Sequence, residues 1–182
     1  MMTNGTTHWQ PAYRLRVAAS RGWFAAMLLL FAAPAPSRAA DPGSPPFEYF
    51  VGHWDCAGHF AANGAAIKST IAFAWQESTQ TLHVQHDDLA PNQYHAVEMW
   101  GQSKAAKDYR STIGDAYSGI RWLTSPGWTG DSLSWTRLDK DKPAERFTYN
   151  RKSASQMTVE WFVAKSNGLV LGDSLDCTRT PS

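Results

Sequence analysis

Two cysteines stand at the two ends of a long series of alternating segments. Cys56 and Cys177 are the only cysteines in this 182-residue sequence. Cys56 lies two residues after Trp54, and Cys177 lies two residues after Leu175. Apolar residues at every second position are typical of a half-buried β-strand. A disulfide between the first and last strands would join the two ends of a sheet, as a closed barrel requires.

Ten segments of the chain show this period-two alternation, with turn-forming residues such as Asn63-Gly64 and Asn167-Gly168 between them. The segments are 53–61, 67–76, 81–87, 94–100, 109–113, 119–124, 132–137, 146–150, 157–163 and 170–178. Short strands at this spacing favour an antiparallel sandwich or barrel. The cysteines favour the barrel, because the first and last strands become neighbours only when the sheet closes. We therefore predict an all-β fold, a single antiparallel up-and-down barrel of about eight to ten strands, with a helical turn at 47–51 plugging one end.

The first 39 residues have the pattern of a secretory signal peptide. Arg14, Arg16 and Arg21 form a basic region, 23–33 is an apolar run, and 37–39 fits the small-x-small cleavage rule. The run has eleven residues, whereas a membrane-spanning helix needs about 20. We expect cleavage and export to the periplasm or the extracellular space. A retained single-span anchor is the alternative.

The predicted organisation is therefore a signal peptide at 1–39, a Pro/Gly/Ser linker at 40–46 and one barrel domain at 47–180. Cleavage removes four arginines and no acidic residue, which leaves 13 Lys and Arg against 16 Asp and Glu, a net charge of −3. This balance lacks the basic footprint of a nucleic-acid-binding domain. No other segment is apolar enough to suggest a membrane span after processing.

Export also decides how the cysteines are interpreted. Exported proteins meet oxidising conditions, so we expect an intramolecular disulfide between Cys56 and Cys177. Two free thiols are one alternative. A metal site built on two such distant cysteines is another, although it would need further ligands.

The segment Gly52-His53-Trp54 resembles the G-x-W motif of calycin-like barrels, a group that includes lipocalins, fatty-acid-binding proteins and nitrobindin-like proteins. In those families the motif opens the first strand and its Trp closes one end of the barrel, which are the roles the resemblance implies for Gly52 and Trp54. Residues 47–180 are most similar to secreted lipocalin-like domains of bacteria. Nitrobindin-like proteins bind haem through a histidine near the C-terminal end of the barrel. Because this chain has no histidine after His95, we expect neither haem nor another cofactor.

Tryptophans are the candidate ligand contacts. We predict that Tyr94 and six tryptophans of the alternating segments face the interior, where they would bind a small hydrophobic or aromatic molecule. The six are Trp54, Trp75, Trp100, Trp122, Trp135 and Trp161. Plain core packing is the alternative, because each such ring buries about 150–250 Å². A cavity is also compatible with the pattern, since barrels of this size can hold one small ligand.

Glu98 shares a strand face with Tyr94 and Trp100. If that face is the inner one, Glu98 can pair with Arg121 or Arg110 and orient a polar group of a ligand. If the face is the outer one, Glu98 is solvated. The residue pattern leaves both possibilities open.

The segment 83–88 (HVQHDD) has the composition of a metal site but not the spacing. In a strand, His83 and His86 face opposite sides, and only His83 and Asp87 share a face. We therefore predict no metal site, and we place His86 in the interior as a further ligand contact. A zinc site assembled across strands is the alternative.

The sequence contains no motif that assigns a reaction. It lacks a G-x-S-x-G elbow, a phosphate loop, a dinucleotide fingerprint and an H-E-x-x-H motif. Our leading hypothesis is an exported barrel that binds a small hydrophobic ligand non-covalently. An enzyme that uses the barrel mouth, with His86 paired to Glu98 or Asp115, remains an alternative for which no substrate can be named.

A structural or interaction module of the cell envelope is the other alternative. Its core would be solid and its outer surface would bind a partner. Apolar residues predicted on that surface are Val97, Met99, Leu123 and Phe162. A contiguous patch of such residues would favour a homodimer.

Overall fold

The computed structural model describes residues 46–181. The predicted signal peptide, its cleavage site and nearly all of the predicted linker lie outside this range. Eleven strands follow one 3-10 turn, η1 (Glu48–Phe50). The strands are β1 (Gly52–Phe60), β2 (Ala66–Gln76), β3 (Thr81–Asp88), β4 (His95–Ser103), β5 (Asp108–Asp115), β6 (Gly119–Ser125), β7 (Trp128–Thr129), β8 (Ser132–Arg137), β9 (Glu145–Ser153), β10 (Gln156–Lys165) and β11 (Gly168–Arg179).

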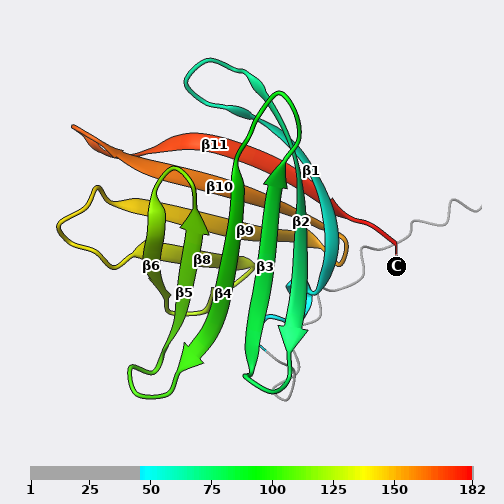
Figure 1. Cartoon of the computed structure of the whole chain (residues 1–182), viewed down its shortest axis with the longest axis vertical. Coiled ribbons are helices and arrows are strands. Elements are labelled where there is room, and N and C mark those ends of the chain that lie inside the picture. Colours follow the sequence, from blue (N-terminus) through cyan, green and yellow to red (C-terminus); the bar gives the residue numbers. More distant parts are fainter. Residues whose placement is uncertain (1–45, 182) are drawn as a thin grey trace, which may run out of the picture. The chain divides into compact units, whose positions relative to one another are not determined.

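The strands form one closed antiparallel barrel, which confirms the predicted fold class. Neighbours in the sheet follow the order β6-β5-β4-β3-β2-β1-β11-β10-β9-β8-β7, and β6 also pairs with β8. Ten strands therefore complete the ring, and the two-residue β7 pairs with β8 inside the β6–β8 connection. In Figure 1, β3, β4 and β5 lie in front, and β8 to β11 cross behind them.

The disulfide joins the first and last strands, as the sequence predicted. Cys56 and Cys177 are direct partners in the β1–β11 register, and their sulfur atoms are bonded. Both side chains are buried and face the interior. The two strands approach closely beside this bond. A Cβ added to Gly58 would lie only 1.8 Å from the carbonyl oxygen of Ser174. Glycine at this position is therefore a requirement of the close approach.

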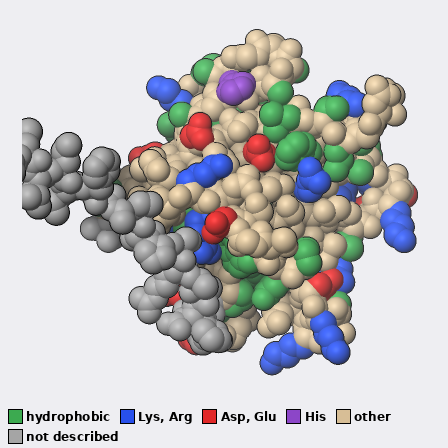
Figure 2. Space-filling view, turned by 180° about the vertical axis from the view of Figure 1, so that it is seen from behind, with side chains coloured by type: hydrophobic (Ala, Val, Ile, Leu, Met, Phe, Trp, Pro, Cys, Tyr) green, Lys and Arg blue, Asp and Glu red, His purple; other side chains and the backbone are tan. Residues whose placement is uncertain are grey.

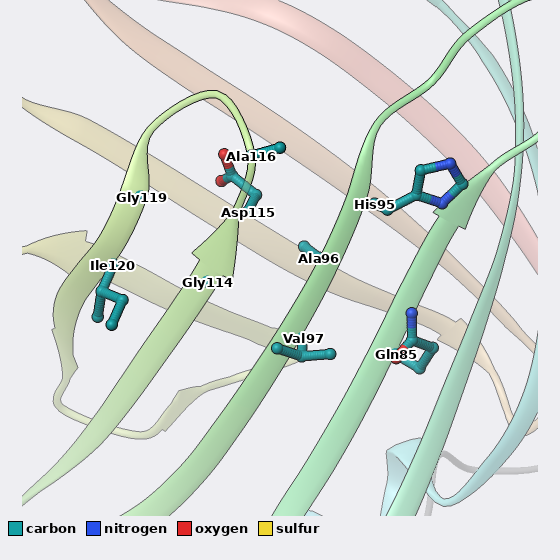
Figure 3. Close-up of a pocket in the computed structure, with 9 residues that line it drawn as sticks. All are labelled: Gln85, His95, Ala96, Val97, Gly114, Asp115, Ala116, Gly119 and Ile120. Carbon is teal, nitrogen blue, oxygen red and sulfur yellow. The ribbon is translucent and has the colours of Figure 1, made fainter.

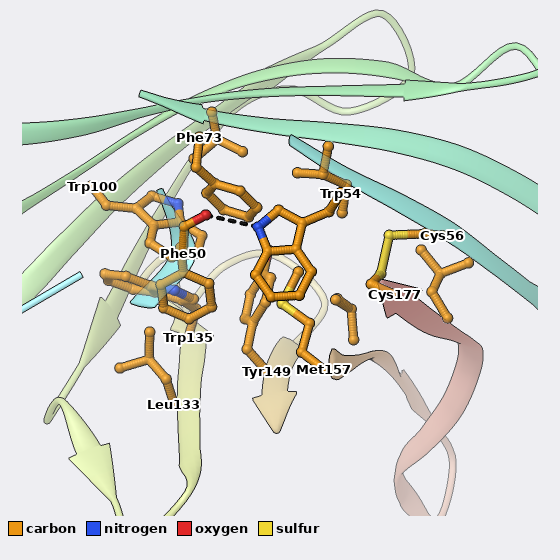
Figure 4. Close-up of a cluster of buried hydrophobic side chains, with 14 of the residues drawn as sticks. Phe50, Trp54, Cys56, Phe73, Trp100, Leu133, Trp135, Tyr149, Met157 and Cys177 are labelled. Carbon is orange, nitrogen blue, oxygen red and sulfur yellow. Dashed lines mark hydrogen bonds between the residues drawn. A yellow bond between two sulfur atoms is a disulfide. The ribbon is translucent and has the colours of Figure 1, made fainter. Parts of the chain in front are cut away.

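One end of the barrel is solid. η1 turns across this end and inserts Phe47 and Phe50 among the buried rings of several strands. The ring of Phe50 lies 5.3 Å from that of Phe73 and 5.2 Å from that of Trp100. Trp54 donates its indole hydrogen to the carbonyl oxygen of Phe50 at 2.8 Å, as Figure 4 shows. The predicted helical plug and the closing role of Trp54 are both found here.

Arg179, the last residue of β11, also holds the plug formed by η1 in place. The guanidinium of Arg179 lies 4.4 Å from the centre of the Trp54 ring. It donates to the carbonyl oxygens of Val51 and Tyr49, on either side of Phe50. The last strand therefore holds the turn that closes the barrel, although the two are about 130 residues apart in the sequence.

The outer surface carries charges of both signs. On the face shown in Figure 2, Lys and Arg side chains are scattered, and Asp and Glu lie between them. Within residues 46–181, no helix has the length and hydropathy needed to cross a membrane.

Candidate functional site

The other half of the barrel interior is a cavity of about 500 Å³. It lies at the end opposite the plug, because its lining includes the last residue of β1 and the β3–β4 and β5–β6 connections. The lining residues are Phe60, Ile67, His86, Asp88, Pro91, Asn92, Gln93, Tyr94, Glu98, Tyr117, Ser118, Arg121, Phe147, Tyr149, Val159, Trp161, Asp173 and Leu175. A volume of this size falls within the range of small-molecule sites.

Aromatic rings form much of the cavity wall. Tyr149 separates the cavity from the plug, because its ring contacts Trp100 at 5.1 Å and Phe50 at 5.4 Å while the residue also lines the cavity. On the neighbouring wall, Phe147 and Trp161 stack at 6.5 Å. Flat apolar walls of this kind suit a ligand with an aromatic or otherwise apolar body.

A buried ion network borders the cavity. The side chain of Arg121 is 3% exposed and contacts two buried carboxylates. It donates to Glu145 at 2.9 Å and to Asp115. It also donates to the hydroxyl of Tyr94 at 3.1 Å. Arg137 contacts the second oxygen of Glu145 at 3.4 Å, so the network joins two guanidinium groups to two buried carboxylates.

Glu98 points inward, which settles the question that the sequence left open. It is 9% exposed, and one of its carboxyl oxygens accepts the indole hydrogen of Trp100 at 2.7 Å. Burial raises the pKa of this carboxyl group, and the hydrogen bond from Trp100 opposes that rise. The predicted pairing of Glu98 with Arg121 or Arg110 is wrong, because Arg121 binds Asp115 and Glu145.

Arg110, the other predicted partner, binds Asp108 at 2.9 Å. Both residues lie at the end of β5 away from the cavity, because β5 begins at Asp108 and enters the mouth at Asp115. Glu98 consequently has no basic partner among the described residues.

Asp173 and Asp88 form a second acidic region of the cavity. Asp173 pairs in the sheet with Phe60 on β1 and Trp161 on β10, two aromatic neighbours that limit its hydration. Burial raises the pKa of Asp173 to about 6, while His86 lowers it and Asp88 raises it further. Nε2 of His86 lies 3.4 Å from Oδ1 of Asp88, without the geometry of a hydrogen bond.

Replacing Asp173 with asparagine should make the empty protein more stable at pH 7.5. The carboxyl group holds a proton in the folded state up to about pH 6, but in the unfolded chain only up to about pH 3.8. Its contribution to the free energy of unfolding therefore falls as the pH rises through this window. We expect Asp173→Asn to raise that free energy by about 1–3 kcal/mol at pH 7.5 and to leave it nearly unchanged at pH 3.5.

Urea unfolding at the two pH values measures this effect. Asp176→Asn is the matched control, because Asp176 lies on the same strand with its side chain exposed on the outer face. A variant of Asp173 that is less stable than the natural protein at pH 7.5 would contradict the expectation.

The structure brings four of the nine predicted ligand-binding residues together at the cavity. His86, Tyr94, Glu98 and Trp161 line it. Trp54, Trp100 and Trp135 are buried in the solid half instead. Plain core packing is therefore the correct interpretation for these three rings.

The remaining two predicted residues lie apart from the cavity. Trp75 is near the plugged end of β2, where its indole donates to Glu77 at 2.8 Å. Trp122 is 53% exposed on the outer face, so its predicted inward orientation is wrong. β6 instead buries Arg121 and Leu123, because Arg121 finds two carboxylate partners inside.

Sequence reasoning missed three acidic residues of the site, Asp88, Glu145 and Asp173. Each sits near the open end of a strand, at an inward position shared with apolar residues. Asp88, for example, follows Leu82, Val84 and His86 at every second position of β3. Extending the alternation to both ends of β3 and β9 would have found Asp88 and Glu145, and Asp173 stands between Leu171 and Leu175 on one face of its segment.

The outer surface has one row of exposed apolar side chains, over β4 and β6. Val97, Met99, Ile120 and Trp122 are each at least 46% exposed. Gly114 pairs with both Val97 and Ile120 and leaves a shallow hollow between them, which Figure 3 shows. Leu123 was predicted on this surface, and that prediction is wrong because its side chain is fully buried.

A cation site is not evident in the described part of the chain. No group of three or more His, Cys, Asp or Glu side chains is placed there to hold a metal ion. The segment 83–88 shows why, since His83 is exposed while His86 and Asp88 face the cavity.

The comparisons with known proteins assign no family to this chain. No protein-family model matches the chain, and no curated protein matches it. Among solved structures, it is similar to a de novo designed fluorescence-activating beta barrel, with 14% sequence identity and a TM-score of 0.37 over 75% of this chain and 99% of the designed one. The strand pairing of this chain itself establishes the closed ten-stranded barrel.

Proposed function

We propose that this protein is an exported small-molecule-binding barrel that holds a ligand with an apolar or aromatic body, non-covalently, in the cavity at its open end. The observation that carries the proposal is the division of the interior. η1 and its neighbouring rings fill one half, while the other half keeps about 500 Å³ of space between aromatic walls. If the barrel had only to be stable, we would expect side chains to fill both halves of its interior, because protein interiors are packed densely.

Binding of a neutral aromatic probe tests the proposal. We expect 1-naphthylmethanol to bind with a Kd of about 0.3 mM, if each of its roughly twelve non-hydrogen atoms contributes about 0.4 kcal/mol. NMR titration of 15N-labelled protein should shift the indole signal of Trp161 and the amides of the lining residues, and leave those of the plug unchanged.

A variant that fills the cavity provides the control. Val159 is a buried lining residue, and Val159→Phe should abolish binding of the probe. The same substitution at Val97, which is exposed on the outer face, should leave binding unchanged. Shifts confined to the outer face, or binding that persists in Val159→Phe, would refute the proposal.

The exposed row on β4 and β6 supports a second candidate function, association with a further copy of the chain. Val97 and Ile120 flank Gly114 of β5, Met99 and Trp122 flank Thr112, and these residues bring no charge to the surface. Sedimentation velocity over a concentration series tests this candidate. A monomer at every concentration would exclude it.

A further inference from the structure

Among the described residues, the cavity is lined by three carboxyl groups that contact no Lys or Arg. Asp88, Glu98 and Asp173 all line it. Asp88 accepts a hydrogen bond from the hydroxyl of Ser69 at 2.6 Å, and Glu98 accepts one from the indole of Trp100. Neither bond brings a positive charge to the carboxylate. Burying carboxyl groups in this way is unfavourable unless something compensates their charge.

The one arginine on the lining cannot provide this compensation. Among the described residues that form the cavity, Arg121 is the sole Lys or Arg. Its guanidinium is already bound by Asp115 and Glu145. With Arg137 on the second oxygen of Glu145, the network holds two guanidinium groups and two carboxylates, so it leaves no unpaired positive charge for the three carboxyl groups. His86 is the other basic group on the lining, and it faces Asp88.

A second, independent feature points to an absent ligand group. Tyr149 is 4% exposed and lines the cavity. Within residues 46–181 its hydroxyl group has no protein partner and is open to the cavity; burial of the ring, with the nearby charges of Glu98 and Asp173, raises its pKa. Nε2 of His86, on the same lining, is buried without a hydrogen-bond partner, whereas buried polar atoms nearly always have one. A polar group of a ligand beside Glu98 would give both atoms a partner.

The aromatic walls of the cavity also favour a cation. Tyr94, Phe147, Tyr149 and Trp161 present their rings to the cavity that holds the three carboxyl groups. The face of an aromatic ring carries partial negative charge and attracts cations. Arg121 already lies 5.7 Å from the centre of the Phe147 ring, which shows that a cation is accommodated at this wall.

We propose that the ligand is a small cationic amine: an aromatic or apolar body that carries a protonated amino group, which binds between Glu98 and Asp173 within reach of the Tyr149 hydroxyl. This inference rests on the proposed binding function and names its ligand class. The cavity would reject carboxylic acids of the same shape, because their charge repeats that of the lining. A protein with this preference would not carry fatty acids.

A matched series of three probes tests the ligand class. 1-Naphthylmethylamine, 1-naphthylmethanol and 1-naphthylacetate share one aromatic body and differ in charge. At pH 7.5 we expect the amine to bind roughly tenfold or more tightly than the alcohol, because charge-assisted hydrogen bonds are about twice as strong as neutral ones. The acetate should bind more weakly than the alcohol. NMR titration, as for the neutral probe, gives all three dissociation constants and locates the binding site.

Two isosteric variants test the assigned carboxyl groups. Glu98→Gln keeps an oxygen that can accept the indole hydrogen of Trp100, and Asp173→Asn keeps the shape of the side chain. Each should weaken binding of the amine by roughly tenfold and leave binding of the alcohol nearly unchanged. Asp176→Asn, on the outer face of β11, should change neither.

The possible outcomes separate the inference from the proposed function. If the alcohol or the acetate binds as tightly as the amine, the inference is wrong and the binding function stands. The inference is also wrong if both carboxyl variants bind the amine like the natural protein. If none of the three probes binds the folded protein, the proposed function itself fails. Circular dichroism of each variant establishes that the barrel is folded, and both variants are expected to fold because they remove a buried charge.

Discussion

Replacing Arg121 with methionine is expected to lower the free energy of unfolding by about 3–5 kcal/mol. The side chains of Asp115 and Glu145 are 0% and 7% exposed, so neither can recover its hydration when the guanidinium is removed. Methionine occupies a similar volume and isolates the effect of the charge. Urea unfolding followed by circular dichroism at pH 7.5 measures the loss.

Two further variants identify the cause of that loss. Arg110→Met removes an arginine whose ion pair with Asp108 is partly exposed, and it should cost less than about 1 kcal/mol. Adding Asp115→Asn and Glu145→Gln to Arg121→Met should restore part of the stability, because no uncompensated buried charge then remains. If Arg121→Met alone proved as stable as the natural protein, the network would contribute little to the free energy of unfolding.

Removing the disulfide is expected to cost about 4–5 kcal/mol in the free energy of unfolding. Cys56 and Cys177 are separated by 121 residues, and the bond restricts this long loop in the unfolded chain. The double substitution Cys56→Ala and Cys177→Ala should therefore shift the urea midpoint strongly to lower concentration. The folded barrel should remain, because seven residue pairs still join β1 and β11.

Reduction provides the control for this experiment. Dithiothreitol should destabilise the natural protein by about as much as the double substitution does, and it should leave the double variant unaffected. A loss below about 1 kcal/mol in both cases would mean that the unfolded chain is already compact without the bond.

The carboxyl groups of the cavity connect stability with the proposed function. Asp173→Asn is expected to stabilise the empty protein and to weaken its binding of amines, two effects of opposite sign from one substitution. A carboxyl group with only a structural role would not give this combination, since its removal would leave binding of the amine unchanged. Glu98 is the second position at which the same trade-off can be measured.

Much of the fold could be predicted because its signals are local. Ten alternating segments, the turns between them and the plug at 47–51 all appear in the structure near their predicted bounds. The disulfide followed from the positions of Cys56 and Cys177 in the first and last segments. The candidate site was only partly predictable, because alternation shows which residues share a face but not which face is buried.

β6 illustrates this limit. Its alternation separates Ile120 and Trp122 from Arg121 and Leu123, and the grouping of tryptophans in the alternating segments favoured Trp122 for the interior. The structure buries Arg121 instead. The two carboxylates that make its burial possible come from Asp115, six residues away, and Glu145, 24 residues away.

By itself, the sequence determined the strands, their antiparallel order and the covalent link between the first and the last of them. Alternation and turn formation act over a few residues, so they can be recognised without knowledge of the folded chain. Only the tertiary structure decided that Trp54, Trp100 and Trp135 fill one half of the barrel while carboxyl groups line the other. The free energy of burying a charge depends on partners from distant strands, and those partners meet only when the ring has closed.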